Sequence, residues 1–368
     1  MKPTSVDLPN LSAHFEAQAV ACERLGSPFT ARLCRLLPGL CDDTTTTGRR
    51  VLGWSGDPRA DALALRLCGG LHRLVLEKAD PELVAAYPPH ETDDPALSAS
   101  VATALRRHDA ALSAALDSAP QTNEIARSAM LLPGFLMLAR ATGVPLALCE
   151  IGASGGLNLL FDRFFYRYGT QHWGAHASAV EIRPELRSPS LPLEGCLKIV
   201  SRQGCDITPV DVSQSEGQMR LRSYVWADQV ARLERLNGAI ALAQDFPYTL
   251  KKADAGAFVV QALAKRPKDA AFVLFHSIMW QYMSGATQNA ILRALQKEGL
   301  RSTSAAPIVH LCMEPLDPND SFATLSLTIW PGGESQHLAK CDFHGRWIEW
   351  IAWRPVAIQP VSLPARGA

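Results

Sequence analysis

The sequence lacks the features that mark several large classes of protein. Its nine cysteines are scattered and no C-x-x-C pair occurs. Cys34 and Cys41 are the closest two, and no second pair of cysteines or histidines follows at a spacing typical of zinc sites. We therefore predict no metal site. An odd number of cysteines without a secretory leader favours a reducing compartment, so we expect a cytoplasmic protein.

Long hydrophobic runs and an excess of one charge are also missing. The most apolar stretch, AMLLPGFLMLARATGVPLALC, is interrupted by Pro133, Arg140 and Pro145 and is too broken for a membrane span. The start, MKPTSVDLPN, has no apolar segment typical of a signal peptide. Lys and Arg total 36, as do Asp and Glu, so the net field attracts neither nucleic acid nor an anionic membrane. We expect a small molecule as the partner instead.

The sequence pattern of the 368 residues changes part-way along the chain. Up to residue 143 the chain shows helical periodicity; in one segment Leu63, Leu67, Leu71 and Leu74 form an apolar stripe. The polar stretch CDDTTTTGRR lacks periodicity and predicts an exposed loop. Residues 1–143 therefore predict an all-helical domain, which we interpret as a cap or substrate domain.

Residues 144–368 alternate short apolar runs with helical segments. Five runs, PLALCEI, LKIVSRQ, PYTLKKAD, AAFVLFHS and PIVHLCMEP, have strand length and are separated by helical segments or loops. ATLSLTIWPGG and QHLAKCDF then follow without room for a helix, and RWIEWIAW alternates as an edge strand does. We predict an α/β fold with a Rossmann-like, mostly parallel, seven-stranded sheet that ends in an antiparallel hairpin. Residues 169–197, rich in Pro and Ser, predict an inserted loop.

The stretch CEIGASGGLN follows the first of these strands and fits two patterns. Gly152-Ala-Ser154-Gly-Gly156 fits G-x-S-x-G, the turn that presents a hydrolase serine. With Glu150 in front, it also fits a cofactor-binding loop of the form E/D-x-G-x-G-x-G, in which Ser154 replaces the middle glycine. Small residues are needed in such a loop because the backbone must approach the cofactor closely.

Two further acids strengthen the cofactor pattern. GCDITP places Asp206 after the second strand, and LKKADA places Asp254 after the third. With the terminal hairpin, this arrangement resembles the class I S-adenosylmethionine-dependent methyltransferases. The resemblance implies that S-adenosylmethionine is the cofactor and that the chain methylates a small polar molecule. The cofactor-binding residues that it implies are Glu150, Gly152, Ser154, Gly156, Asn158, Asp206 and Asp254.

Other functions stay open at this stage. A serine hydrolase would use Ser154 as its nucleophile, but such enzymes have strands before the elbow, where this chain has about 140 residues of helical pattern. Glu150 would then be a buried carboxylate without a role, at a cost in free energy. A nicotinamide-dependent oxidoreductase and a non-catalytic nucleotide-cofactor binder also fit the glycine loop.

Polar residues elsewhere are candidates for the chemistry. His276, after the fourth strand, is a candidate general base because its ordinary pKa lies near neutrality, and Tyr282 follows in the same motif. A histidine hydrogen-bonded at a strand end is the structural alternative. Asn123, Glu124 and Arg127 in TNEIARSA are candidate substrate-binding residues. Their structural alternative is an N-cap at Asn123 with an ion pair on one helix face.

Most of the chain resembles a bacterial family, domain of unknown function 2332. The resemblance brings no substrate, and the sequence indicates neither the oligomeric state nor the atom methylated. The segments that carry it are TNEIARSA at 122–129, EIGASGGLNLLFDRF at 150–164, RQGCDITPVDV at 202–212, YVWADQVARLERL at 224–236 and FHSIMWQY at 275–282.

Overall fold

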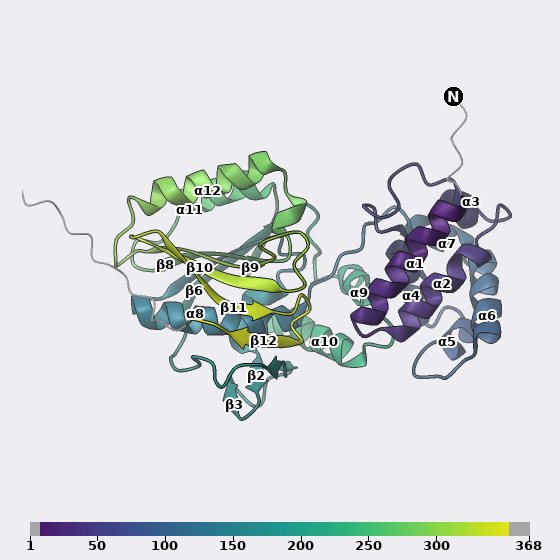
Figure 1. Ribbon diagram of the computed structural model, residues 1–368, viewed down its shortest axis with the longest axis horizontal. Helices are drawn as coiled ribbons and strands as arrows, with labels where there is room; N and C mark the ends of the chain where they lie inside the picture. The colour runs from purple at the N-terminus through teal and green to yellow at the C-terminus, as the bar shows by residue number, and fades with distance from the viewer. Residues whose placement is uncertain (1–7, 353–368) are drawn as a thin grey trace, which may run out of the picture. The chain divides into compact units, whose positions relative to one another are not determined.

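The computed structural model describes residues 8–352, which divide into two compact units (Figure 1). Among the described residues, the first unit comprises residues 8–122 and 214–233, and the second comprises residues 123–213 and 234–352. This division differs from the domain boundary at residue 143 that the change in sequence pattern predicts. The helix before that boundary packs on the sheet of the second unit, and a later segment returns to the first.

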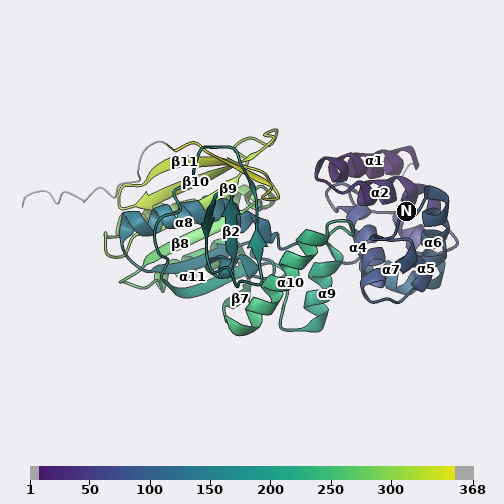
Figure 2. The same cartoon turned by 90° about the horizontal axis from the view of Figure 1, so that it is seen from below.

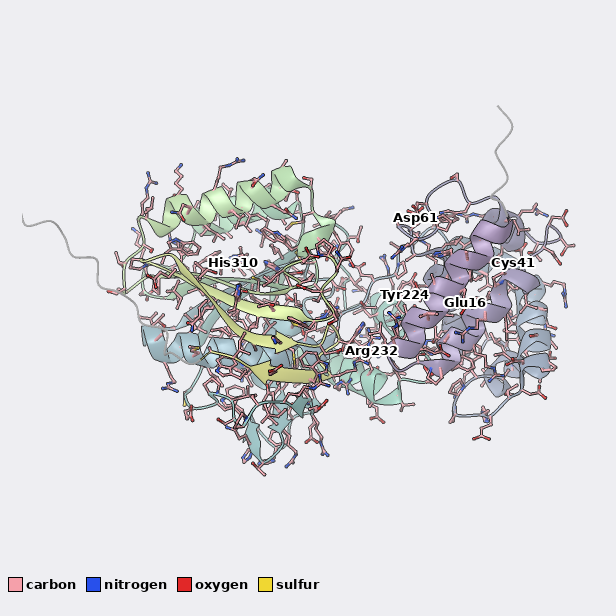
Figure 3. The ribbon with its side chains drawn as sticks, in the orientation of Figure 1. Glu16, Cys41, Asp61, Tyr224, Arg232 and His310 are labelled. Atoms are coloured by element: carbon pink, nitrogen blue, oxygen red, sulfur yellow. The ribbon has the colours of Figure 1, made fainter. Side chains whose placement is uncertain are left out.

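The first unit is helical, as the sequence predicts. Its helices are α1 (Leu8–Arg24), α2 (Pro28–Leu40), α3 (Thr46–Leu52), α4 (Leu63–Leu76), α5 (Pro81–Ala85), α6 (Asp94–Arg107), α7 (Asp109–Ala115) and α9 (Ser215–Ser223). The apolar faces of α1, α2, α4, α6 and α7 meet in one core. Directly after α9, Tyr224 (Figure 3) packs so closely on α4 that a Cβ at Gly69 would lie 2.5 Å from its Cε1 atom. The second segment of the unit is therefore part of its core.

The stretch CDDTTTTGRR was expected to be a loop, but its second half begins helix α3. The Thr45 hydroxyl caps the helix by accepting the backbone N–H of Gly48 at 2.9 Å. The Asp109 carboxylate accepts the N–H groups of Thr46 and Thr47 at 2.8 and 2.7 Å. Asp109 lies more than 60 residues away in the chain, so no local pattern shows this second cap.

The second unit contains the sheet. Its elements, with α10 crossing the boundary between the units, are η1 (Ile125–Arg127), α8 (Ser128–Thr142), β1 (Leu146–Ile151), η2 (Leu157–Arg163), β2 (Phe165–Tyr168), β3 (Gln171–Trp173), β4 (Glu181–Ile182), β5 (Glu185–Leu186), β6 (Ile199–Asp206), α10 (Val230–Asp245), β7 (Thr249–Lys252), α11 (Ala255–Ala264), β8 (Ala271–Ser277), η3 (Trp280–Tyr282), α12 (Gly285–Gly299), β9 (Ile308–Glu314), β10 (Ala323–Trp330), β11 (Glu334–Cys341) and β12 (Trp347–Trp350).

The sheet is large and mixed, with the order β5-β12-β11-β10-β9-β8-β1-β6-β7. Strands β7, β6, β1, β8 and β9 are parallel, and β10, β11 and β12 continue the sheet by antiparallel pairing. All eight strands expected from the sequence are present. The expected count of seven is wrong, because β12 pairs with β11 and the two-residue β5 then pairs with β12 at the edge, giving nine strands.

Helices cover both faces of the sheet (Figures 1 and 2). α11 and α12 contribute side chains to one apolar core together with β1, β8 and β9. α8 lies on the opposite face, where a Cβ at Gly134 would come within 2.8 Å of Leu311. The segment 169–197, expected to be a loop, contributes β3 and β4 to a small sheet of order β3-β2-β4 and also forms β5.

Within residues 8–352, no helix combines the length and the apolar character that crossing a membrane requires. α8, which contains most of the longest apolar stretch of the sequence, has 15 residues. Its apolar side chains are buried in the second unit. The hydrophobicity of α8 therefore serves the packing of the sheet.

Candidate functional site

The glycine loop after β1 has an unusual backbone. Gly152, Ser154 and Gly156 have φ angles of +63°, +54° and +74°, the left-handed region that favours glycine. A Cβ at Gly152 would lie 2.8 Å from Cγ of Met279, and one at Gly156 would lie 2.5 Å from Cε2 of Tyr248. Both glycines are therefore required by the backbone angle and by the close approach of a neighbouring side chain.

Asp206 ends β6 beside this loop. Its carboxylate accepts the backbone N–H of Ser154 at 2.8 Å and that of Thr208 at 2.9 Å. The structure thus brings Asp206 to the glycine loop, as the sequence predicts. These two bonds hold the backbone of the loop.

Glu150, near the end of β1, is a buried acid to which no described residue donates a hydrogen bond at Oε2. Its side chain is only 4% exposed, and its Oε2 atom has no hydrogen-bond partner among the described residues. Burial and the nearby Asp206 raise the pKa of Glu150 well above its ordinary value, while the Arg127 guanidinium acts in the opposite direction. A group that donates hydrogen bonds to this carboxyl would relieve the cost of burying it.

Asp254 follows β7 and has a local role. It is exposed, and its carboxylate caps α11 by accepting the N–H of Ala257 at 3.0 Å. The adjacent Ala253 N–H donates to the main-chain carbonyl of Asp206 at 3.0 Å. Glu150, Asp206 and Asp254 therefore lie at the carboxyl ends of three adjacent strands, but only Glu150 is buried.

A polar contact set joins the start of α8 to the glycine loop. The amide of buried Asn158 donates to the Glu124 carbonyl at 3.3 Å, and its oxygen accepts the Ser128 hydroxyl at 2.8 Å. The side-chain oxygen of Asn123 accepts the N–H of Leu157 at 3.0 Å. The cap expected at Asn123 is wrong, because the Glu124 carboxylate caps η1 while Asn123 holds the loop.

Arg127 ties this region to the end of β8. Its Nε donates to the Phe343 carbonyl at 2.9 Å, and its Nη1 donates to the Ser277 carbonyl at 3.3 Å. The nearby Glu124 is 2% exposed, with Oε2 3.6 Å from Nδ1 of His344. A substrate-binding role for Asn123, Glu124 and Arg127 stays a prediction.

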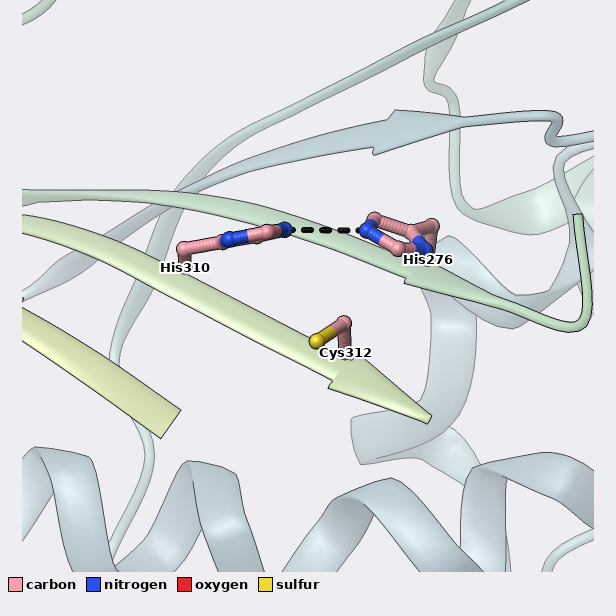
Figure 4. A group of neighbouring side chains, drawn as sticks. All are labelled: His276, His310 and Cys312. Atoms are coloured by element: carbon pink, nitrogen blue, oxygen red, sulfur yellow. Dashed lines mark hydrogen bonds between the residues drawn. The ribbon is translucent and has the colours of Figure 1, made fainter. Parts of the chain in front are cut away.

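A second polar cluster lies on β8 and β9 (Figure 4). Nδ1 of His276 is 2.7 Å from Oε1 of Glu314, and its Nε2 is 2.9 Å from Nε2 of His310. Cys312 is the register partner of His276, and the ligand atoms of the two histidines and this cysteine all lie within 4.8 Å of one another. Figure 3 shows His310 on the central part of the sheet.

The two sites occupy opposite faces of the sheet. Glu150 is the register partner of Phe275, and successive side chains of a strand point to opposite faces, so His276 lies on the face away from Glu150. On that face, burial and then His276 lower the pKa of His310 to about 3, and burial raises the pKa of the Cys312 thiol to about 12. Both groups are neutral near pH 7.

Three residues of this cluster are not among the candidates that the sequence indicates. His310, Cys312 and Glu314 alternate within the apolar run PIVHLCMEP, and this period of two was the available signal. Tyr282, in contrast, is 78% exposed, so the structure does not place it among the buried polar groups. A catalytic role for His276 or Tyr282 stays a prediction.

Comparison with known proteins gives a family and no closer relative. Residues 12–350 match the family described as "Uncharacterized protein conserved in bacteria (DUF2332)". No curated protein and no solved structure matches the chain. The match covers most of the chain, in agreement with the segments that carry the resemblance in the sequence.

Proposed function

The chain belongs to the DUF2332 family, and we propose that it binds S-adenosylmethionine and transfers the methyl group to a small polar molecule. The order of the parallel strands supports this proposal. Numbered along the chain, β7-β6-β1-β8-β9 is 3-2-1-4-5, the order of a Rossmann-like sheet. The order reverses between β1 and β8, and in such sheets ligands bind beyond the carboxyl ends of the strands at this point. The glycine loop follows β1 there.

The observation that carries the proposal is the buried carboxyl of Glu150. A buried polar group without a partner costs about 1–3 kcal/mol. Ser154 is 5% exposed, and its Oγ likewise has no partner among residues 8–352. Glu150 Oε2 and Ser154 Oγ, both at one glycine loop, are therefore available to form hydrogen bonds with a polar ligand.

The residues at the carboxyl ends of β1 and β6 fit an adenosyl cofactor. Glu150 and Ser154 would accept or donate hydrogen bonds at its polar groups, and the resemblance to the methyltransferases implies that Asp206, which contacts the Ser154 N–H, lies near the ribose hydroxyls. S-adenosylmethionine supplies a methyl group that is activated by a sulfonium. The chain itself would align the acceptor and exclude water.

The same geometry gives less support to a hydrolase. A nucleophilic serine needs an adjacent base within hydrogen-bond reach. The Ser154 hydroxyl has no such neighbour in the described part of the chain. We therefore favour cofactor binding over nucleophilic catalysis at this loop.

Calorimetry on the full chain tests the proposal. S-adenosylhomocysteine is expected to bind at one site per chain, and NAD is expected to give no heat of binding. Glu150→Gln keeps the shape of the side chain but replaces one carboxyl oxygen with an amide nitrogen that cannot accept a hydrogen bond, so we expect binding to weaken at least about tenfold, that is by about 1.4 kcal/mol. Glu334→Gln, at an exposed acid of the same unit, is the matched control and should bind like the wild type.

Three outcomes would contradict the proposal. Binding of NAD instead of S-adenosylhomocysteine would favour an oxidoreductase. Equal binding by the wild type and Glu150→Gln would place the cofactor elsewhere. Labelling of Ser154 by a fluorophosphonate would favour the hydrolase.

A further inference from the structure

The 2.9 Å contact between Nε2 of His276 and Nε2 of His310 can be made by a ring N–H or by a metal ion between the two rings. Nδ1 of His276 faces the Glu314 carboxylate at 2.7 Å, so this nitrogen carries the ring proton. In a neutral ring, Nε2 of His276 is then a lone pair, and it lies 2.9 Å from Nε2 of His310. Two lone pairs at this distance repel each other unless a proton or a metal ion lies between them.

The distances suit a metal as well as a proton. A tetrahedral zinc with Zn–N bonds of about 2.0–2.1 Å separates two ligand nitrogens by roughly 3.3 Å. The separation between His276 and His310 is shorter by only a few tenths of an ångström. The Cys312 sulfur lies on the same face, within 4.8 Å of a ring nitrogen of each histidine, where it would provide a third ligand.

Glu314 has the position of an outer-sphere carboxylate. Histidines that bind metals generally donate their second ring N–H to a carboxylate, which fixes the ring and raises its basicity. Oε1 of Glu314 also accepts the backbone N–H groups of Met279 at 3.0 Å and Trp280 at 3.3 Å. The Trp280 ring stacks on His276 with its centroid 5.0 Å away. The ring of His276 is thus held in one orientation.

We propose that His276, His310 and Cys312 bind a zinc ion, with Glu314 as the carboxylate that orients His276. Imidazole and thiolate together favour zinc over magnesium or calcium, which prefer oxygen ligands. Binding would release the thiol proton of Cys312 to the solvent. Three protein ligands leave a fourth position for a water or a substrate atom, as in catalytic zinc sites. This site is independent of the proposed cofactor site.

Metal binding to the full chain tests the proposal. After chelator treatment, the chain is titrated with Zn²⁺ in competition with a chromophoric chelator, and separately with Co²⁺. We expect one Zn²⁺ per chain and a thiolate-to-cobalt charge-transfer band. Cys312→Ser should abolish that band, and Glu314→Gln should weaken zinc binding about 10–100-fold while keeping the band. Circular dichroism of both variants establishes that they fold.

Two other groups provide the control variants. In the helical unit the sulfur atoms of Cys34 and Cys68 lie 3.8 Å apart. In and just after β3 of the second unit, the rings of exposed His172 and His176 have centroids 5.2 Å apart. Cys34→Ser and His172→Gln should bind zinc like the wild type. The proposal is overturned if the wild type does not bind, if Cys312→Ser keeps the band, or if a control variant loses the site.

Discussion

Two buried acids, one in each unit, have opposite chemistry at similar burial. Asp80 in the helical unit is 1% exposed and accepts hydrogen bonds from the Leu83 N–H, Arg107 and His108. Burial raises its pKa, but these partners together lower it below the ordinary value. Glu150 in the sheet unit is 4% exposed, has no such partners among the described residues, and its pKa is raised. Burial alone therefore does not decide the charge of an acid; its partners do.

This difference separates stability from function in the two units. A buried acid with a full set of donors caps a helix and joins it to its neighbours. A buried acid without them reduces stability, and such groups are retained where a ligand uses them. Three sets of substitutions test the comparison, in order of expected effect.

Asp80→Ala should have the largest effect. It removes the cap of α5, where the carboxylate accepts the N–H groups of Glu82 and Leu83, and the contacts with Arg107 and His108. We expect the helical unit to lose about 2 kcal/mol of unfolding free energy. Hydrogen exchange of the α5 and α6 amides measures this loss. Glu82→Ala, at an exposed side chain of the same turn, should change little; equal losses would refute a special role for Asp80.

Glu150→Gln should have the opposite sign. The pKa of Glu150 is higher in the folded chain than in the unfolded chain. Its contribution to the free energy of unfolding is therefore fully present below about pH 4.5, the unfolded pKa, and is lost as the pH rises towards the folded pKa. The glutamine side chain cannot ionise, so the variant should be more stable than the wild type by about 1 kcal/mol at about pH 8. Urea unfolding from acid to mildly basic pH measures the difference, which should shrink at acid pH. A difference that is constant with pH would mean that Glu150 is paired in solution.

The smallest effects are expected for two buried serines. Ser27 caps α2 by accepting the Thr30 N–H at 3.3 Å, and its hydroxyl donates to Asp228. Ser27→Ala should cost about 1 kcal/mol. Ser154 has no hydroxyl partner among the described residues, so Ser154→Ala removes a buried unpaired hydroxyl and should leave stability unchanged or raise it by up to about 1 kcal/mol. Thermal unfolding of the two variants compares them, and a large loss for Ser154→Ala would show that its hydroxyl makes a stabilising contact in solution.

Local patterns predicted much of the fold and part of the site. Runs of buried apolar residues located all the main strands, and the glycine loop was recognised because left-handed φ angles and close approach both select glycine. Asp206 was placed correctly because the carboxyl ends of neighbouring parallel strands meet at one edge. The exposed cap at Asp254 and the loop-binding role of Asn123 were not predicted, since both depend on which backbone N–H lies nearby.

Long-range pairing explains the other differences. α3 begins where it does because Asp109 caps it from a distant helix, and the sheet has nine strands because two residues of the inserted segment pair with β12. The return of residues 214–233 to the helical unit leaves no mark in the sequence, because a helical pattern does not specify which core its apolar face joins.

The sequence by itself determined the main strands and most of the helices, and it determined the family. Only the tertiary structure decided that His276 meets His310, 34 residues later in the chain, and that Glu150 and His276 lie on opposite faces. The reason is register: a shift of one residue between two strands moves every side chain to the other face, and apolar runs buried on both faces do not encode that choice.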